Sequence, residues 1–373
     1  MKLSASPTTT STALPSRSAR HRRNPRQRAQ RTQRPEWRGM QVAVVVVSYN
    51  TCDLLRRCLR SVLATPLPPG TMLQVLVVDN ASQDGSAAMV AGEFPTVDLV
   101  ASPINLGFTG GNNLALHALG FPVTLSAAAQ PLAPTPQAEP PDFVLLLNPD
   151  AEVQGDAIVL MARFLAETPQ AGACGAHLRY ANGRFQHGAF RFPTLAQVAL
   201  DLFPLTGLPG IHRLYDSRLN GRYPARRWLS TQPFEVDFVL GAALMLAGAA
   251  IRAVGGLDDG YFMYCEEMDL CLRLHAAGWG VYTLPAALVI HHEGQSSRQV
   301  RWDAYERLWR SRLRFYAKHS ARYPAGYTHL VRGLLRLSAA WHSRQARRRF
   351  ATGQATGLET GRELAAYRAV SRL

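Results

Sequence analysis

The sequence predicts an α/β fold, in which a mostly parallel central sheet is flanked by helices and followed by a C-terminal helical extension. Three observations predict it. Apolar runs typical of strands alternate with helical patterns between residues 42 and 167. Polar clusters follow three of those runs, and the last part of the chain has helical, basic patterns. Strands that alternate with helices form βαβ units, and these build parallel sheets.

The predicted strands are short β-branched and aliphatic runs, of the kind that parallel sheets bury on both faces. Each predicted helix has apolar residues three and four positions apart. A polar turn at 79–86 leads into one further helix. We predict strands at 42–47, 75–78, 99–101, 143–147 and 284–290, and helices at 53–63, 110–119, 155–167, 265–277, 300–318 and 327–350.

Charge and composition divide the chain into three parts. Residues 1–39 carry ten basic residues and one acid, with few apolar residues, and are predicted to be a disordered basic leader. Residues 40–297 carry fourteen basic and twenty-one acidic residues and are predicted to be one domain, interrupted by a flexible Ala/Pro-rich insertion at 121–142. Residues 298–373 carry seventeen basic residues and four acids, and are predicted to be a basic helical extension.

This charge distribution bears on partners and location. An acidic middle region argues against a nucleic-acid groove, so no nucleic-acid partner is expected. No apolar run is long enough to span a bilayer, and the polar start lacks the apolar core of a secretory signal, although a transit peptide remains an alternative. The five cysteines form no CxxC pair and are expected to be reduced. We expect a cytoplasmic protein.

Ligand-binding side chains are expected where the predicted strands end, because open parallel sheets bind ligands beyond the carboxyl ends of their strands. Asp79 could accept hydrogen bonds from a nucleoside, and Asp150 could bind Mg²⁺ or Mn²⁺, which prefer oxygen ligands. Asp and Asn are also common in turns, so each residue alone has a structural alternative. The same edge is predicted to hold Ser48, Tyr49, Asn50 and Asn148.

Three further segments carry candidate groups. Residues 105–113 form a Gly-rich loop whose backbone N–H groups could meet a phosphate, with Asn105, Gly107 and Asn112 as binding candidates. Glu266, Glu267 and Asp269 crowd three carboxylates into four residues, and neighbouring acids raise a carboxyl pKa towards that of a general base. His291 follows an apolar run and could ligate a metal.

Together these segments resemble the family 2 glycosyltransferases of the GT-A fold, close to their rhamnosyltransferase-like branch. The resemblance covers about residues 41–297 and lies in six stretches that occur in the family's order. They are VVVVSYNTCDLLRRCLRSVL, VLVVDNASQDGS, NLGFTGGNN, FVLLLNPDAEV, GAALMLAGAAIRAVGGLDDGYFMYCEEMDLCLRL and HHEGQSS.

The resemblance implies a Rossmann-like GT-A domain and roles for particular residues. Asp79 would contact the nucleoside, and Asp150 would be the second acid of the family's Asp-x-Asp metal motif, with Asn148 at the first position. Glu267 stands where the family usually has an Asp that acts as the base, so Glu266-Glu267 departs from the usual Glu-Asp pair and Asp269 is the alternative. His291 would assist the metal or the diphosphate.

The implied activity is the inverting, metal-dependent transfer of a sugar from a nucleotide diphosphate to a hydroxyl of a polysaccharide or lipid-linked acceptor. The resemblance favours dTDP-rhamnose over UDP- or GDP-linked sugars. A nucleotidyltransferase and an inactive nucleotide-sugar-binding scaffold are the alternatives. Basic helices in 298–350 fit peripheral contact with the inner face of a membrane, or else a helical cap whose aromatic residues face inward.

Overall fold

The computed structural model describes residues 39–205, 210–292 and 301–373, which belong to one compact unit. The predicted leader, except Gly39, and the segment 293–300 lie outside the described residues. The strands are β1 (Gln41–Ser48), β2 (Met72–Asn80), β3 (Asp98–Ser102), β4 (Phe143–Leu147), β5 (Ala151–Val153), β6 (Ala171–Arg179), β7 (Ala189–Phe190), β8 (Phe234–Glu235), β9 (Phe238–Val239), β10 (Ala243–Ala247) and β11 (Gly280–His291).

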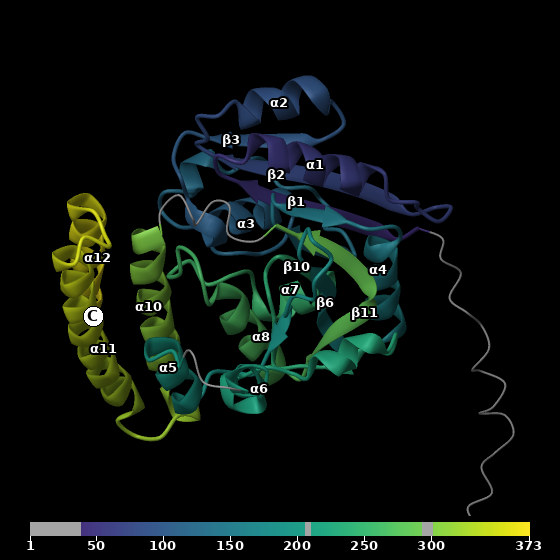
Figure 1. The fold of residues 1–373 in the computed structure, drawn as a ribbon. Helices are drawn as coiled ribbons and strands as arrows, with labels where there is room; N and C mark the ends of the chain where they lie inside the picture. The colour runs from purple at the N-terminus through teal and green to yellow at the C-terminus, as the bar shows by residue number, and fades with distance from the viewer. Residues whose placement is uncertain (1–38, 206–209, 293–300) are drawn as a thin grey trace, which may run out of the picture. The chain divides into compact units, whose positions relative to one another are not determined.

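Helices lie on both sides of the sheet and beyond it (Figure 1). They are α1 (Cys52–Leu63), α2 (Ser86–Glu93), α3 (Gly107–Ala118), α4 (Ala157–Glu167), α5 (Leu195–Leu202), α6 (Ile211–Tyr215), α7 (Gly248–Val254), α8 (Glu266–Ala276), α10 (Arg301–Lys318), α11 (Tyr327–Ala351) and α12 (Gly357–Ser371). Segment 121–142 is mostly irregular, with one short 3-10 helix at Gln130–Leu132.

The main sheet confirms the predicted fold class. Its strand order is β3-β2-β1-β4-β10-β6-β11-β5, with β8 pairing to β11. Strands β1 to β4, β6 and β11 run in one direction, whereas β10 is antiparallel to both β4 and β6. The carboxyl ends of β1, β2, β4 and β11 therefore reach one edge of the sheet, as does the amino end of β10.

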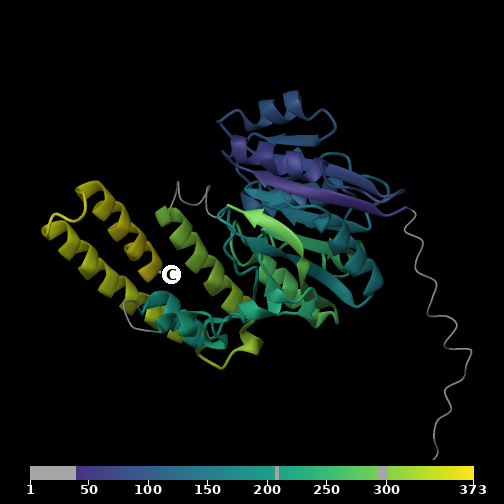
Figure 2. The ribbon, with the colours of Figure 1, turned by 45° about the vertical axis from the view of Figure 1, so that its right-hand side comes forward.

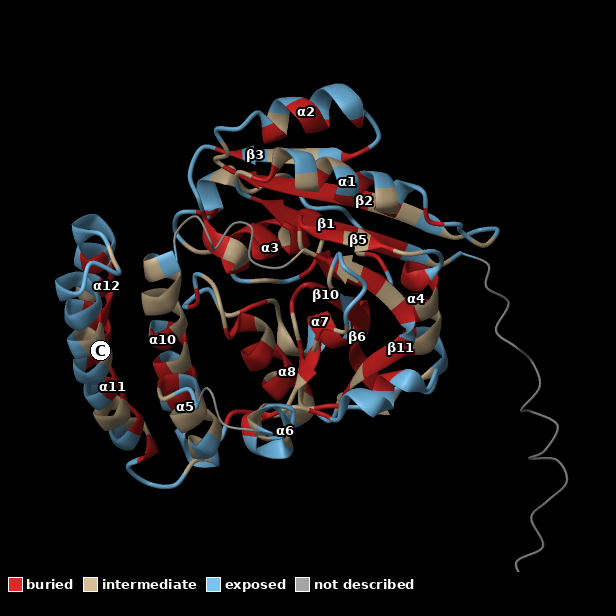
Figure 3. Ribbon diagram, viewed as in Figure 1, coloured by how far each residue is buried: buried red, intermediate tan, exposed pale blue. Residues whose placement is uncertain are grey.

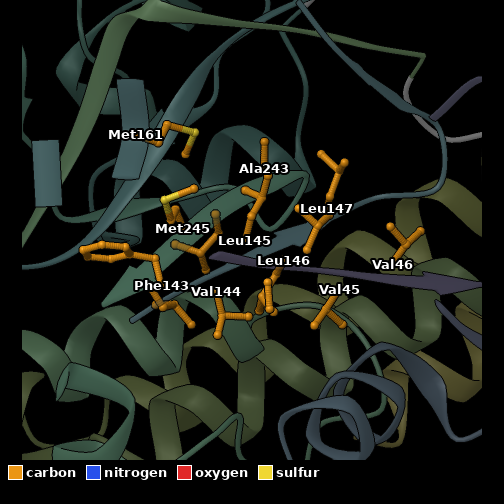
Figure 4. Close-up of a cluster of buried hydrophobic side chains, with 14 of the residues drawn as sticks. Val45, Val46, Phe143, Val144, Leu145, Leu146, Leu147, Met161, Ala243 and Met245 are labelled. Carbon is orange, nitrogen blue, oxygen red and sulfur yellow. The ribbon is translucent and has the colours of Figure 1, made fainter. Parts of the chain in front are cut away.

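The core is built where β1, β4 and β10 lie side by side (Figure 4). Every residue of β4 is buried, and Val42–Val47 of β1 are buried as well. Met161 of α4 and Met245 of β10 pack into the same cluster. A strand buried on both faces needs a continuous apolar run, which explains why these sequence signals were strong.

The C-terminal helices have their own apolar cluster. Trp309, Phe315 and Tyr316 of α10 are buried against Cys265 and Met268 at the start of α8. This cluster also receives side chains from α5, α11 and α12. The buried residues line the inner sides of these helices, and their outer sides are exposed (Figure 3). In the turned view α11 and α12 lie beyond α10, away from the sheet (Figure 2). Within the described ranges, no helix combines the length and the apolar character needed to cross a bilayer.

Candidate active site

Asp79 ends strand β2 in a buried position at the edge of the sheet, where its side chain is 3% exposed. One carboxylate oxygen, Oδ2, accepts a hydrogen bond from the backbone N–H of Ser82 at 3.0 Å. The other, Oδ1, is buried and has no hydrogen-bond partner among the described residues. A buried acceptor without a partner is costly, so this oxygen is suited to a donor group on a ligand.

The loop after β1 is fastened to the loop after β2. Asn50 has left-handed backbone geometry, with a φ of 52°, which asparagine tolerates better than most residues. Its N–H donates to Ser82 at 2.9 Å, and its side-chain oxygen accepts from the N–H of Gln83 at 2.8 Å. The Ser48 hydroxyl bonds to Thr51, and Tyr49 is 39% exposed. Asn50 thus fixes the path of the chain at this edge of the sheet, where Tyr49 is exposed.

The Gly-rich segment is more helical than the sequence suggested. Helix α3 begins at Gly107, three residues earlier than predicted, so most of the expected loop forms its first turns. Asn105 caps the N–H of Gly107, and Asn112 donates to the carbonyl of Phe108. The glycines allow this geometry because Gly107 has a φ of 74° and Gly111 packs closely on Val47.

Replacing Gly107 with alanine should lower the free energy of unfolding by about 2 kcal/mol, because its φ is unfavourable for alanine and the new Cβ would clash with the carbonyl oxygen of Phe262. Gly92 is the matched control, since it lies in α2 with open space around it. Gly92→Ala should be neutral or stabilising. Chemical denaturation measures both variants, and equal effects would contradict this reading of Gly107.

Two asparagines that the sequence analysis did not select hold this segment in place. The side chain of Asn80 donates to the carbonyl of Gly107 at 2.9 Å and accepts from the N–H of Leu106 at 3.3 Å. Asn113 exchanges two hydrogen bonds with the backbone of Leu257, at 2.8 and 2.9 Å. Both amides are buried, Asn80 at the end of β2 and Asn113 within α3, and the stretches DNAS and GGNN indicated these positions only as generally polar.

A second polar group joins the ends of β4, β5 and β11. Asp150 Oδ1 lies 3.3 Å from Nε2 of His291, and the Asn148 side-chain nitrogen lies 3.3 Å from the same ring nitrogen. Both Asp150 and His291 are buried. Gln186, which sequence reasoning missed, places its side-chain nitrogen 3.1 Å from Nδ1 of His291 and orients the ring. No pattern in the surrounding sequence RFQHGAF indicated this contact.

These residues fit part of a divalent-cation site. Two ligands that each lie about 2.1 Å from an octahedral ion are about 3 Å apart, close to the separation of Asp150 and His291. Within residues 39–205, 210–292 and 301–373, no three His, Cys, Asp or Glu side chains cluster as a complete metal site. Mg²⁺ and Mn²⁺ commonly take further ligands from water and substrate phosphates, so two protein ligands suffice chemically.

Glu266 and Glu267 form a coupled carboxyl pair at the start of α8. Burial, together with the neighbouring Glu267, raises the pKa of Glu266 well above its usual range. Burial also raises the pKa of Glu267, to about 6. Hydrogen bonds from the backbone and from the Glu266 side chain lower this pKa, but burial outweighs them. Oε2 of each is buried without a hydrogen-bond partner in the described chain. Glu266 is therefore the proton-holding partner, and Glu267 is the one ready to accept a proton near neutral pH.

Asp269, the alternative base, lies in a different environment. It is fully buried and accepts hydrogen bonds from Arg273 at 2.8 Å and His319 at 2.8 Å, and Lys318 lies 2.7 Å away. Burial opposes ionisation, but the bonds from Lys318, Arg273 and His319 outweigh it and lower the pKa of Asp269. A carboxylate held in this way is a poor proton acceptor.

The residues before β10 contact both Glu267 and Asn148, which is the neighbour of Asp150 in the second polar group. A Cβ at Gly241 would contact the ring of Phe108 and the Cβ of Glu267, so Glu267 lies beside the residue that leads into β10. The next residue, Ala242, accepts a hydrogen bond from the N–H of Asn148 at 3.0 Å. The sequence-predicted residues thus lie along one edge of the sheet, except Asp269, which faces α10.

A comparison with known protein families identifies the class of enzyme to which this site belongs. Residues 39–312 match the model described as glycosyltransferase-like family 2. The chain belongs to this family. The match includes β1 to β11 and most of α10, and it confirms the family that the sequence motifs resemble.

Relatives of this family 2 glycosyltransferase include known rhamnosyltransferases. The N-acetylglucosaminyl-diphospho-decaprenol L-rhamnosyltransferase of Mycobacterium tuberculosis is 29% identical over 316 residues, which cover 82% of this chain and 94% of the relative. The rhamnosyltransferase WbbL of Escherichia coli is 27% identical over 178 residues, covering 48% of this chain and 62% of WbbL.

A solved structure shows the same fold. The mannosyltransferase PcManGT of Pyrobaculum calidifontis, solved in complex with GDP-Man and Mn²⁺, is similar with a TM-score of 0.50 and 15% identity. The alignment covers 91% of this chain and 87% of that one. The likeness in fold to this structure therefore extends over the sheet and into the C-terminal helices.

Proposed function

We propose that the enzyme transfers rhamnose from dTDP-rhamnose, with inversion, to a hydroxyl of a lipid-linked saccharide. The observation that carries the proposal is the placement of the Glu266–Glu267 pair beside Gly241, at the edge that also holds Asp79 and Asp150. The rhamnosyltransferase relatives, one of them named for an acceptor on a decaprenol diphosphate, favour this donor and this acceptor class.

The donor would lie along the carboxyl edge of the sheet. Asp79 Oδ1 would accept a hydrogen bond from the nucleoside, beside Ser48, Tyr49 and Asn50. Asp150 and Nε2 of His291 would hold Mg²⁺ or Mn²⁺ next to the diphosphate, with Asn148 beside that nitrogen and Gln186 orienting the histidine ring through Nδ1. A divalent ion there supplies positive charge that stabilises the leaving diphosphate.

Glu267 would act as the general base in a single displacement. Its carboxylate takes the proton of the acceptor hydroxyl, and the acceptor oxygen forms a bond to the anomeric carbon. The bond between that carbon and the diphosphate oxygen breaks, and the nucleoside diphosphate leaves with the electron pair. Attack opposite to the leaving group inverts the anomeric configuration. Glu266, neutral when Glu267 is charged, avoids a second negative charge beside the base.

The test is an assay with dTDP-, UDP- and GDP-linked sugars and a lipid-linked saccharide, followed by NMR of the product. Transfer from dTDP-rhamnose with inverted configuration supports the proposal. A retained configuration would refute the single displacement. Nucleotide binding without transfer would favour the inactive nucleotide-sugar-binding scaffold, and failure to bind any nucleotide, with or without Mn²⁺, would contradict the proposal.

The rate of transfer should depend on pH through Glu267. A general base must be deprotonated, so kcat should rise with pH and level off above about 6, the pKa of Glu267. Below that pH, protonated Glu267 cannot accept the acceptor proton. A pH profile of kcat at saturating donor and acceptor measures this dependence. A flat profile between pH 5 and 8 would contradict the assignment, since ~90% of the base would change state over that range.

Helix α11 offers a surface for peripheral membrane contact, which we propose as a second part of the function. It contains six arginines and no acidic residue. Leu330, Leu337 and Trp341 are 50%, 64% and 41% exposed and lie seven and four residues apart, which places them on one face. Exposed arginines lie on this face at Arg344 and Arg348 and towards its flank at Arg336 and Arg347. Apolar side chains among arginines suit an anionic lipid surface.

Replacing Arg344, Arg347 and Arg348 with glutamine should weaken binding to anionic vesicles about a hundredfold, because each basic residue near such a surface contributes about 1 kcal/mol. The charge-matched control replaces Arg362, Arg368 and Arg372, which are exposed on or next to α12. Vesicle sedimentation with phosphatidylglycerol measures the partition. Equal losses in both triple variants would mean that binding follows net charge, and not the α11 face.

A further inference from the structure

One face of helix α10 lies along the loop that leads into the catalytic helix α8. Residues at three- and four-residue spacing on a helix share a face, as Arg307, Ser311, Arg314 and Lys318 do here. The guanidinium of Arg307 lies 4.8 Å from the centre of the Phe262 ring. The Ser311 hydroxyl donates to the carbonyl of Met263 at 2.8 Å.

The C-terminal half of the same face of α10 makes ion pairs. Arg314 donates to Asp258 at 2.8 Å, and Lys318 lies 2.5 Å from the other oxygen of Asp258. Lys318 also lies 2.7 Å from Asp269, so one ammonium group bridges the start of the loop and the first turns of α8. The next residue of the chain, His319, bonds to Asp269 as well. Contacts from α10 therefore hold the loop at both ends.

The loop itself needs support, because it ends in an unfavourable conformation. Tyr264 and Cys265 both have left-handed backbone geometry, with φ values of 72° and 67°. Two consecutive non-glycine residues of this kind are unfavourable and persist only where the surroundings hold them. They turn the chain immediately before Glu266 and so decide where the carboxyl pair points. The loop also contacts the first turn of α3, since the carbonyl of Phe262 accepts a hydrogen bond from the N–H of Phe108 at 2.9 Å.

We propose that the polar face of α10, formed by Ser311, Arg314 and Lys318, positions the Glu266–Glu267 pair for the reaction. These are positioning residues, because they act through the loop and Asp269 and do not reach the pair themselves. The inference rests on the proposed role of Glu267. On this inference α10 contributes to catalysis, although this helix follows, in the sequence, the segment that carries the family's motifs.

Positioning of this kind should affect the chemical step more than donor binding. Small displacements of a reacting group lower the rate steeply. Asp79 and His291 lie on β2 and β11 and Asp150 lies between β4 and β5, away from the contacts described for α10. Lys318→Met keeps the long apolar stem and removes the charge. We expect kcat to fall by roughly tenfold or more, with the dissociation constant for the nucleoside diphosphate within about twofold of the wild type.

Two variants complete the series. Lys318→Arg restores a cation and should recover most of kcat. Arg310→Ala is the matched control on the same helix, because Arg310 is exposed and, among the described residues, its ion pair is with Glu306 of α10 itself. It should leave kcat unchanged. If Lys318→Met does not fold, Ser311→Ala takes its place, with an expected loss of about threefold in kcat.

A second readout does not depend on activity. Hydrogen exchange of the amides in 258–269 should be faster in Lys318→Met than in the wild type or in Arg310→Ala. Unchanged exchange there, or kcat within twofold of the wild type, would overturn the inference. Failure of the proposed function gives a different pattern, in which the wild type transfers no sugar while exchange in this segment still responds to Lys318→Met.

Discussion

Replacing Glu267 with glutamine should lower kcat by roughly a thousandfold while nucleotide binding is retained. General base catalysis contributes about 10²–10⁴-fold, and glutamine has the shape of glutamate but cannot accept the acceptor's proton. Burial raises the pKa of Glu267 to about 6, so the native side chain is mostly ionised at neutral pH, and the variant removes that proton acceptor. Steady-state transfer assays and calorimetry with the nucleoside diphosphate measure the two effects separately.

Glu266 provides the matched control for this variant. It is a neighbouring buried carboxyl whose pKa is raised well above the usual range, so it is neutral when the base is charged. A neutral amide should replace a neutral acid at lower cost, and we expect Glu266→Gln to lose about tenfold or less in kcat. The opposite order, with Glu266→Gln inactive and Glu267→Gln active, would move the role of base to Glu266.

Replacing Asp150 with alanine should weaken metal-dependent nucleotide binding by about a hundredfold or more. The variant removes the only carboxylate described next to His291, leaving one protein ligand for a divalent ion that requires oxygen ligands. Even residues that only orient metal ligands cost about 10–100-fold when removed, so loss of a ligand should cost at least as much. Titration with nucleoside diphosphate, with Mn²⁺ and with EDTA, measures the loss.

Glu152 is the control for Asp150, since it lies two residues further along the chain, in β5, but makes other contacts. Its carboxylate lies 2.7 Å from His292 and 3.6 Å from Arg57. Glu152→Ala should keep the metal-dependent part of nucleotide binding. If Asp150→Ala retains binding that EDTA abolishes, the metal is held elsewhere and the Asp150–His291 pair has a structural role.

The sequence predicted best those elements whose local pattern and tertiary setting agree. Residues 143–147 form β4 as predicted, because five consecutive large apolar residues suit only a fully buried strand at that length. Strand β10 was not predicted, although ALMLA is equally buried. Alanine, leucine and methionine favour helices, and only the place between β4 and β6 makes this segment a strand. Strand β6 was missed for the same reason, since AGACGAHLR has no β-branched residue.

The site was predictable in its acids but not in their environments. Three carboxylates at 266–269 looked alike in sequence, and periodicity alone indicated only that they diverge around the helix. Their difference comes from elements far along the chain: Gly241 beside Glu267, and Lys318 and His319 against Asp269. The contact of Gln186 with His291 likewise joins positions 105 residues apart. Such pairings depend on topology, which no local pattern encodes.

The place of β10 in the sheet also bears on how the chain acquires its fold. Leu147 at the end of β4 pairs with Ala243, which a ribosome adds only after β5, β6 and the long segment up to β9. Until then β4 is a fully apolar strand with one open edge, the kind of surface that pairs with other chains and aggregates. A nascent chain that ends before residue 247 should therefore need protection, and recombinant fragments truncated between β4 and β10 should be recovered mainly in aggregates.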